Sequence, residues 1–190
     1  MMTMRDMFAT FPVLETPILL LRQLRNGDAE ALFAVYSDEE TLRYYNMLPH
    51  QSVEETEELI RLNQERFENQ RAIRWAITRK GEDMALGTCG FHAFDETYQR
   101  AEMGYVLNKV YWRQGIMSAA LQTIVTFGFV SAALHRIEAT VTNDNFPSKA
   151  ILTKLGFSYE GCRRQRFFFS NCFWDEHNFG LLKEDYARNL

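Results

Sequence analysis

The chain has 190 residues, of which 46% are hydrophobic and 24% are charged. This length allows one domain, or at most two small ones, with a proper hydrophobic core, and the composition is that of an ordinary soluble globular protein. The 21 basic and 25 acidic residues leave a net charge of −4. Bulk electrostatics therefore give no reason to expect direct binding of nucleic acid.

Export, membrane insertion and zinc binding are also unexpected. The first eight residues contain charged side chains and no apolar core, unlike a signal peptide. The most apolar run, residues 124–134, is too short to cross a bilayer. Cys89, Cys162 and Cys172 are odd in number and lack Cys-x-x-Cys spacing, which indicates reduced thiols rather than disulfides or a zinc site. We therefore expect a cytoplasmic protein with no membrane partner and no metal.

The first half of the chain predicts strands and two main helices. The Asn26-Gly27-Asp28 turn and a Ser52-x-x-Glu55 capping box mark the two helix starts. Gly87 and Gly90 lie inside one predicted strand and indicate a bulge or a close approach of two backbones. Apolar runs and alternation predict a strand over residues 18–24, a helix over 29–36, a short helix and a loop over 38–50, a helix from 52 to about 69, and strands over 73–78, 85–94 and 101–108.

The second half predicts strands that alternate with helices. Pro147 near the start and Gly156 just after the end support a helix over 146–155. The other predicted elements are a long helix over 116–134, a strand over 135–142, and two long antiparallel strands over 157–169 and 172–182. Together the elements predict one α/β domain of the α+β type, whose mixed, mostly antiparallel sheet has about seven strands flanked by about four helices. Residues 1–13 are expected to form an N-terminal extension before a domain over 14–190.

The strand-to-helix turn within residues 111–121 is the most informative stretch. A tight turn into a helix leaves the first helical N–H groups unpaired, and these donors together with the helix dipole attract a phosphate. Gly115 allows backbone angles closed to other residues and lets a ligand approach closely, and Arg113 puts a cation beside the same place. On these residues alone, the turn is either a phosphate-binding loop or an ordinary connection.

Three groups of motifs carry a family resemblance. Trp112-Arg113-Gln114-Gly115-Ile116-Met117 resembles the acetyl-CoA pyrophosphate loop of the GNAT superfamily of N-acetyltransferases. Asn145-x-x-Ser148 with Lys154-Leu155-Gly156-Phe157 resembles the second cofactor motif of that family. Glu102-x-Gly104-Tyr105, the run from Thr16 to Arg22, and Glu160-Gly161 resemble one branch, the ribosomal-protein (Rim-type) N-terminal alanine/serine acetyltransferases. The resemblance extends from about residue 14 to residue 184.

This resemblance implies an acetyl-CoA-dependent N-acetyltransferase with a GNAT-like fold over residues 14–190. Such an enzyme moves an acetyl group to a primary amine by direct attack in a ternary complex, with acetyl-CoA as cosubstrate. The branch implies that the acceptor is the N-terminal α-amine of a protein or peptide, such as a ribosomal protein. Two alternatives stay open: a small amine acceptor (a polyamine, amino acid or drug), and an acyl-CoA-binding module that has lost catalysis.

Three positions depart from the superfamily pattern. Trp112 stands where the loop usually begins with Arg or Gln, and Met117 stands where it usually ends with Gly or Ala. Both residues are at home in the Rim-type branch, so they narrow the assignment. Leu152 stands where the superfamily often has a tyrosine general acid. Because leucine cannot donate a proton, Leu152 favours the alternative of a lapsed binding module.

The resemblance also implies a set of cofactor-binding residues. Negative charge develops on the thioester oxygen during acetyl transfer, and backbone N–H groups of residues 105–107 would stabilise it if their strand splays from its neighbour. The same splay would let the pantetheine arm of the cofactor pair with this strand. The implied set comprises Tyr105, Val106, Leu107, Trp112, Arg113, Gln114, Gly115, Ile116, Met117, Ser118, Asn145 and Ser148.

Glu102 and Ser148 are the candidate catalytic residues. The attacking amine must be neutral, and an α-amine has a pKa of about 8 and a lysine about 10.4, so a base acting through water lowers the cost. Glu102 is the candidate base, the alternative being an ion pair with an arginine such as Arg100. Ser148 is the candidate acid or thiol contact, the alternative being a helix cap. Asn145 is expected to orient the cofactor arm or to cap the helix, and Tyr159 is a second candidate proton donor.

An aromatic run and two histidines complete the prediction. Phe167-Phe168-Phe169 with Phe173 and Trp174 is expected to be core, edge cover or the surface of a homodimer. Strand alternation cannot place all three phenylalanines on one face, so part of the run is left to meet a partner or substrate. His92 and His135 lie in apolar strand contexts and are expected to be structural.

Overall fold

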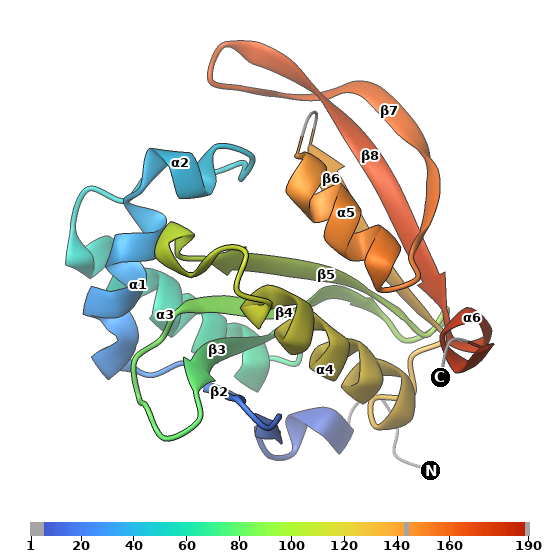
Figure 1. Cartoon of the computed structure of the whole chain (residues 1–190), viewed down its shortest axis with the longest axis horizontal. Coiled ribbons are helices and arrows are strands. Elements are labelled where there is room, and N and C mark those ends of the chain that lie inside the picture. The colour runs from blue at the N-terminus through green and yellow to red at the C-terminus, as the bar shows by residue number, and fades with distance from the viewer. Residues whose placement is uncertain (1–5, 143–144, 189–190) are drawn as a thin grey trace.

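The computed structural model describes residues 6–142 and 145–188 and shows one sheet with helices on both faces (Figure 1). The strands lie in the order β1-β2-β3-β4-β5-β6-β8-β7, and each neighbouring pair is antiparallel except β5 with β6. In this part of the chain the strands are β1 (Leu14–Glu15), β2 (Leu19–Gln23), β3 (Ile73–Arg79), β4 (Gly87–Asp95), β5 (Arg100–Leu107), β6 (Arg136–Thr142), β7 (Ser158–Phe169) and β8 (Cys172–Leu182).

The helices fill the connections between these strands. They are α1 (Ala29–Tyr36), α2 (Glu39–Leu42), α3 (Val53–Glu68), α4 (Ile116–Val130), α5 (Phe146–Lys154) and α6 (Lys183–Arg188), with 3₁₀ helices η1 (Asp6–Phe8), η2 (Asn26–Asp28) and η3 (Lys109–Tyr111). The predicted α/β class with a mixed, mostly antiparallel sheet is confirmed. The counts exceed the prediction because β1 and α6 are too short to produce a periodic apolar pattern, whereas α2 lies within the short helix and loop predicted over residues 38–50.

Each face of the sheet has its own hydrophobic core. One core lies under α4 and α5 and contains Trp75 and Leu121, and the other lies under α1 and α3 and contains Leu32 and Ile60. Alternation along β3 serves both cores, because Trp75 points to the first and Ala76 to the second. Consecutive residues on the central strands therefore face two different layers of the molecule.

The N-terminal segment packs into the first of these cores. Met7 is buried there, and the rings of Phe11 and Phe67 lie 4.9 Å apart. The indole nitrogen of Trp75 donates a hydrogen bond to the Pro12 carbonyl at 2.7 Å. Residues 6–12 therefore pack against the domain that begins at residue 14.

The parallel strands β5 and β6 diverge after a short paired stretch. They pair only from Arg100 to Glu102 on β5 and from Arg136 to Glu138 on β6. Beyond this point β6 stays paired with β8 up to Thr142, whereas residues 103–107 of β5 have no strand on that side. The condition set for residues 105–107, that their strand splays from its neighbour, is met in the structure, and the splay leaves an open strand edge inside the sheet.

The β7–β8 hairpin projects beyond the rest of the sheet (Figure 1). Its tip carries Phe168 and Phe173, whose rings lie 4.9 Å apart and which are each 58% exposed. These two members of the aromatic run therefore do not belong to the core, and their register as a cross-strand pair explains the contact between them.

Candidate functional site

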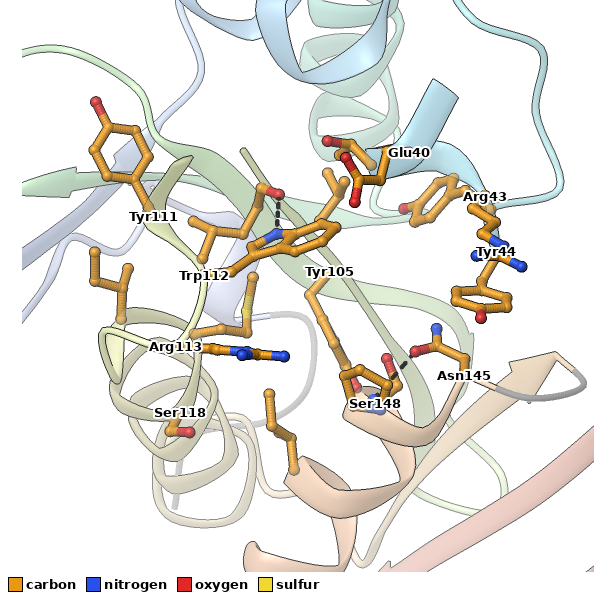
Figure 2. Close-up of a pocket in the computed structure, with 18 of the residues that line it drawn as sticks. Glu40, Arg43, Tyr44, Tyr105, Tyr111, Trp112, Arg113, Ser118, Asn145 and Ser148 are labelled. Carbon is orange, nitrogen blue, oxygen red and sulfur yellow. Dashed lines mark hydrogen bonds between the residues drawn. The ribbon is translucent and has the colours of Figure 1, made fainter. Parts of the chain in front are cut away.

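A cavity of about 660 Å³ opens at the mouth of the splay between β5 and β6. Its walls come from the end of β5, the turn before α4, the first turns of α4 and α5, and the segment around α2 (Figure 2). The structure brings these predicted cofactor-binding residues together around it: Tyr105, Val106, Leu107, Trp112, Arg113, Gly115, Ile116, Met117, Ser118, Asn145 and Ser148. We call this space the first cavity.

The turn before α4 has the backbone shape that a bound anion requires. Arg113 and Gly115 have positive φ angles of 60° and 78°, and no side chain caps the first turn of α4. A Cβ atom on Gly115 would meet no protein atom within 4 Å, so the space beside this glycine is open. The uncapped amides at the start of α4 therefore face a cavity that can hold an anionic group.

Positive charge dominates the first cavity. Arg43, Arg113 and Lys154 line it, and none of them forms an ion pair among residues 6–142 and 145–188. The carboxylate of Glu40 also lines the cavity but lies 3.3 Å from the Lys109 ammonium group. An anionic ligand would therefore be attracted to this space.

Trp112 and Gln114 have different places in the turn. The Trp112 indole nitrogen donates to the Leu107 carbonyl at 2.8 Å, and its ring forms a wall of the first cavity (Figure 2). Gln114 instead donates to the Val110 carbonyl at 3.0 Å and accepts from Arg79 at 3.2 Å. Gln114 is the one predicted cofactor residue of the turn that does not line the cavity, because these bonds hold its side chain on the outside.

The start of α5 places Ser148 beside Tyr105. The Asn145 side chain caps the helix by accepting from the Ser148 backbone N–H at 3.2 Å, and both residues line the first cavity (Figure 2). Burial raises the pKa of Tyr105 to about 12, and the nearby Ser148 side chain partly opposes this shift. The hydroxyl groups of Tyr105 and Thr41 are buried at the cavity wall without a hydrogen-bond partner of normal geometry. Buried hydroxyls in this state are costly, so a polar ligand would stabilise them.

Leu152 does not occupy a position from which a proton donor could act. It is fully buried in the core under α5, and Ile151 lines the first cavity in its place. Residues 148 and 152 therefore do not share the face of α5 that lines the cavity. Because an α-helix has 3.6 residues per turn, either Ile151 or Leu152 can lie on the same face as Ser148. Here Leu152 packs into the core and Ile151 lies beside Ser148 at the cavity.

A second cavity, of about 360 Å³, lies beside the paired end of β5 and β6 and is lined by Glu102. Successive residues on a strand face opposite sides of a sheet, so Glu102 and Tyr105 serve different faces of β5. The structure therefore separates the two candidate catalytic residues, placing Glu102 in the second cavity and Ser148 in the first.

The Glu102 carboxylate accepts a hydrogen bond from a hydroxyl group and has no arginine partner among the described residues. Thr140 donates to one carboxylate oxygen of Glu102 at 2.8 Å, and His92 Nε2 lies 3.9 Å from the other. Arg100 instead approaches Asp95 at 3.5 Å and Glu138 at 3.6 Å. The alternative that Glu102 pairs with Arg100 is therefore contradicted.

The other glutamates of the second cavity are neutralised by arginine. The Arg136 guanidinium donates to Glu138 at 2.9 Å and to Glu160 at 2.8 Å, and this contact holds the pKa of Glu160 below its usual range. Within residues 6–142 and 145–188, Glu102 is the carboxylate of this cavity that lacks a guanidinium partner. Burial lowers the pKa of His92, with Glu102 opposing the shift, so burial disfavours the protonated form of His92 that could act as a counter-ion beside Glu102.

The remaining candidates lie away from both cavities. Tyr159 is 54% exposed, lines neither cavity, and has its hydroxyl 3.2 Å from His177 Nδ1. His135 is exposed at the start of β6. In the described ranges, no cluster of three His, Cys, Asp or Glu side chains is arranged to hold a metal ion, and no helix there has both the length and the apolar character of a membrane span.

The segment around α2 contributes residues that the sequence did not single out. Thr41, Arg43, Tyr44 and Tyr45 all line the first cavity. The Asp38 side chain caps α2 by accepting from the Thr41 N–H at 2.7 Å. The short helix predicted within residues 38–50 is present, but no motif marked its side chains as part of a site. The Asp-x-x-Thr spacing is a helix-cap signal that fixes where this helix begins.

Comparison with known proteins places this geometry in a family. Residues 19–158 match the sequence profile described as acetyltransferase (GNAT) domain. The chain is 38% identical over 173 residues to an uncharacterized N-acetyltransferase, YoaA, of Bacillus subtilis, covering 91% of this chain and 98% of that protein. It is 32% identical over 94 residues, 50% of this chain and 52% of its relative, to the ribosomal-protein-serine acetyltransferase of Escherichia coli. It is 24% identical over 148 residues, 78% of this chain and 77% of its relative, to the spermidine N(1)-acetyltransferase of the same organism.

Solved structures give the same answer at the level of the fold. A GNAT-family acetyltransferase from Bacillus anthracis superimposes with a TM-score of 0.82 at 27% identity, covering 91% of this chain and 99% of that one. RimL, a ribosomal L7/L12 alpha-N-protein acetyltransferase in complex with coenzyme A, superimposes with a TM-score of 0.82 at 23% identity, covering 90% of this chain and 98% of that one.

Proposed function

The chain belongs to the GNAT family of acetyltransferases and is an N-acetyltransferase. From that premise we propose that acetyl-CoA binds in the first cavity. We propose further that its acetyl group passes directly to a primary amine held in the second cavity. One observation carries this proposal: two cavities of different charge border the same splayed pair of strands. The first is lined by three unpaired cations, and the second by one unpaired carboxylate. Coenzyme A is an anion and a protonated amine is a cation, so each substrate has a complementary side.

The cofactor would lie along the open edge of β5. Its pyrophosphate would accept hydrogen bonds from the first amides of α4 beside Gly115, with Arg113 adding charge. The amide groups of its pantetheine arm would pair with residues 103–107, which lack a neighbouring strand on that side. The arm would then end near Tyr105 and Ser148, where two hydroxyl groups face the cavity.

The transfer step would use groups on both faces of β5. The amine nitrogen forms a bond to the thioester carbonyl carbon, and the carbon–sulfur bond then breaks to release the coenzyme A thiolate. Backbone N–H groups of residues 105–107 would stabilise the oxyanion. Glu102 would accept the proton of the amine through a water molecule, and Ser148 or Tyr105 would donate a hydrogen bond or proton to the departing sulfur. This direct transfer requires no metal ion and no covalent intermediate on the enzyme.

The acceptor that we propose is the N-terminal α-amine of a protein or peptide. The relative named as a ribosomal-protein-serine acetyltransferase supports this class, whereas the relative named as a spermidine N(1)-acetyltransferase supports a small amine as the alternative. Leu152 no longer supports a lapsed binding module, because its side chain does not line the cavity.

Release of free thiol from acetyl-CoA, measured with a panel of amines, tests the proposal. We expect faster acetylation of short peptides with a free Ser or Ala N-terminus than of spermidine or free lysine. A preference of about tenfold or more for a small amine would overturn the peptide assignment and leave the acetyltransferase in place. Calorimetric binding of acetyl-CoA without turnover of any amine would instead identify a binding module.

A further inference from the structure

The Arg74 side chain crosses the sheet toward the open edge of β5. Arg74 on β3 pairs with Gly90 on β4, and Gly90 pairs with Gly104 on β5. The Arg74 Nη2 atom lies 3.2 Å from the position that a Cβ atom on Gly104 would take. Neighbouring strands are about 4.8 Å apart, so the Arg74 side chain starts on β3, passes over β4 and places its guanidinium group at β5. Gly104 leaves room for the guanidinium group, whereas Gly90 allows the backbones of β3 and β4 to approach closely, since a Cβ atom there would strike the Ile73 carbonyl oxygen.

The charge of Arg74 has no carboxylate partner in the described part of the chain. Its Nη1 atom donates to the Thr88 hydroxyl at 3.3 Å, and Tyr36, Tyr45 and Cys89 surround it. Burial raises the pKa values of Tyr36 and Cys89 to about 12, so these two neighbours carry no charge at pH 7. A cation held away from water among neutral groups is costly, and an oxygen acceptor on a ligand would stabilise it.

Glu102 provides the opposite charge on the same face of β5. It lies two residues before Gly104, and strand alternation puts both on one side of the sheet. His92 separates the two charges: its Nε2 atom is 3.9 Å from Glu102, and its Cε1 atom is 3.6 Å from the Cβ position of Gly104. One unpaired carboxylate and one unpaired guanidinium therefore flank Gly104, beside the edge that β6 leaves open.

We propose that Glu102 and Arg74 together recognise an α-amino-acyl group, in which the amine lies next to a carbonyl or carboxylate. The amine would lie toward Glu102, and the neighbouring oxygen would accept a hydrogen bond from Arg74. A polyamine has only cationic groups and no oxygen acceptor, so Arg74 disfavours it. This inference rests on the proposed acetyl transfer and narrows its acceptor. A peptide N-terminus and a free amino acid share the required chemistry.

The test compares two amines of similar size, alaninamide and 2-aminobutane, of which only the first has a carbonyl next to the amine. Thiol release from acetyl-CoA is measured for the wild type and for Arg74→Gln. We expect the substitution to lower kcat/KM for alaninamide by about 10-fold to 100-fold, the range for losing a hydrogen bond to a charged group, and to change that for 2-aminobutane by less than about threefold. Equal losses for both amines would overturn the proposal.

Three controls keep the result interpretable. Arg71→Gln removes an exposed arginine just before β3 and should leave both amines unaffected. Gly104→Ala keeps Arg74 but adds a methyl group 3.2 Å from its guanidinium, so it should also lower the rate selectively for alaninamide, which covers the case that Arg74→Gln does not fold. Thermal melting and acetyl-CoA affinity report whether each variant is intact.

Turnover of a panel of amines by the wild type distinguishes a peptide N-terminus from a free amino acid as the acceptor. It also distinguishes failure of the α-amino-acyl inference from failure of the proposed acetyl transfer. Faster turnover of an Ala-initiated peptide than of free alanine assigns the peptide N-terminus, and the reverse assigns the amino acid. Equal turnover of alaninamide, 2-aminobutane and spermidine would overturn the α-amino-acyl inference while acetyl transfer stands. Turnover of no amine at all would overturn acetyl transfer itself.

Discussion

The two cavities differ in how the chain encodes them. The first is built mainly from two contiguous stretches, the turn before α4 and the start of α5, together with the end of β5. The second takes its charged groups from β5, β6 and β7, and the nearby Arg74 and His92 come from β3 and β4. This difference shows that the proposed cofactor cavity depends mainly on residues that are neighbours in sequence. The proposed acceptor cavity depends instead on the register in which distant strands pair.

The largest effect is expected from Glu102→Gln, which should affect the acceptor side alone. Removing a general base typically costs about 10²-fold to 10⁴-fold in rate, so kcat/KM for the amine should fall by this amount while acetyl-CoA affinity stays unchanged. The remaining rate should follow the fraction of neutral amine and rise with pH up to the pKa of an α-amine, about 8. Stopped-flow thiol release across pH, with calorimetric titration of acetyl-CoA, checks both parts.

Glu138→Gln is the matched comparison for this substitution. Glu138 lines the same cavity but is already paired with Arg136, so its loss should change the rate far less than the loss of Glu102. Equal effects of the two variants would show that the cavity needs only its summed charge, and that Glu102 has no special role.

The next largest effect should be confined to the cofactor side. Gly115 has a φ of 78° and an open space beside it, so Gly115→Val places a branched side chain where the pyrophosphate is proposed to lie. The strained backbone costs about 1–3 kcal/mol of stability, and loss of about two hydrogen bonds to charged oxygens weakens acetyl-CoA binding about 100-fold or more. Calorimetry on the folded variant measures this directly. Wild-type affinity would rule out a phosphate-binding turn.

Ser148→Ala should have a moderate effect that joins the two sides. If Ser148 donates to the departing thiolate, its loss should lower kcat about 10-fold to 100-fold and weaken acetyl-CoA binding only modestly. Because the Tyr105 hydroxyl lies beside it, Ser148→Ala/Tyr105→Phe should be slower than either single variant. Wild-type turnover by Ser148→Ala would mean that the serine serves only the N-terminal turn of α5 and that Tyr105 or water supplies the proton.

The smallest effect concerns stability and pH. Burial lowers the pKa of His50, which lines neither cavity. Its Nδ1 atom forms a hydrogen bond of 2.8 Å with the Thr56 hydroxyl. The unfolded histidine, with a pKa near 6.5, therefore binds a proton before the folded one does. Stability should fall as pH drops below about 6.5, with a slope of at most about 1.4 kcal/mol per pH unit from this residue.

Denaturant unfolding between pH 5 and 8 measures that slope, which His50→Gln should flatten. Burial also lowers the pKa of His92, so His92→Gln should change the slope in the same direction. The two variants should differ in activity, because only His92 lies beside Glu102. An acceptor KM that changes equally in both would contradict the placement of the acceptor site near His92.

Much of the first cavity was predictable because its residues are neighbours in sequence. Gly115, Arg113 and Ser148 belong to short motifs at helix starts, where local backbone geometry decides which groups face a ligand. The splay of β5 was a condition for the implied role of residues 105–107, and the sequence itself did not predict it. What local reasoning could not decide was side-chain direction: Gln114 bonds backward to Val110, and Leu152 turns into the core.

The second cavity was out of reach of the sequence for a different reason. Thr140 and Glu102 are 38 residues apart, and their contact depends on a parallel register that no single motif encodes. Gly90 was predicted to mark a bulge or a close approach of two backbones, but the long reach of Arg74 past it appears only when three strands are laid side by side. The sequence therefore predicts where acetyl-CoA would bind better than what would receive its acetyl group.

The open edge of β5 has a consequence for hydrogen exchange. In an antiparallel pair, alternate residues of a strand direct their amides to the partner, so between residues 103 and 107 one set of amides bonds to β4 and the other points to the gap left by β6. The free protein should therefore show fast and slow deuterium uptake alternating residue by residue along a single strand. A bound pantetheine arm would slow deuterium uptake at the fast-exchanging amides and leave the slow ones unchanged. Exchange rates at these five consecutive amides would therefore show whether the cofactor pairs with β5 as a strand would.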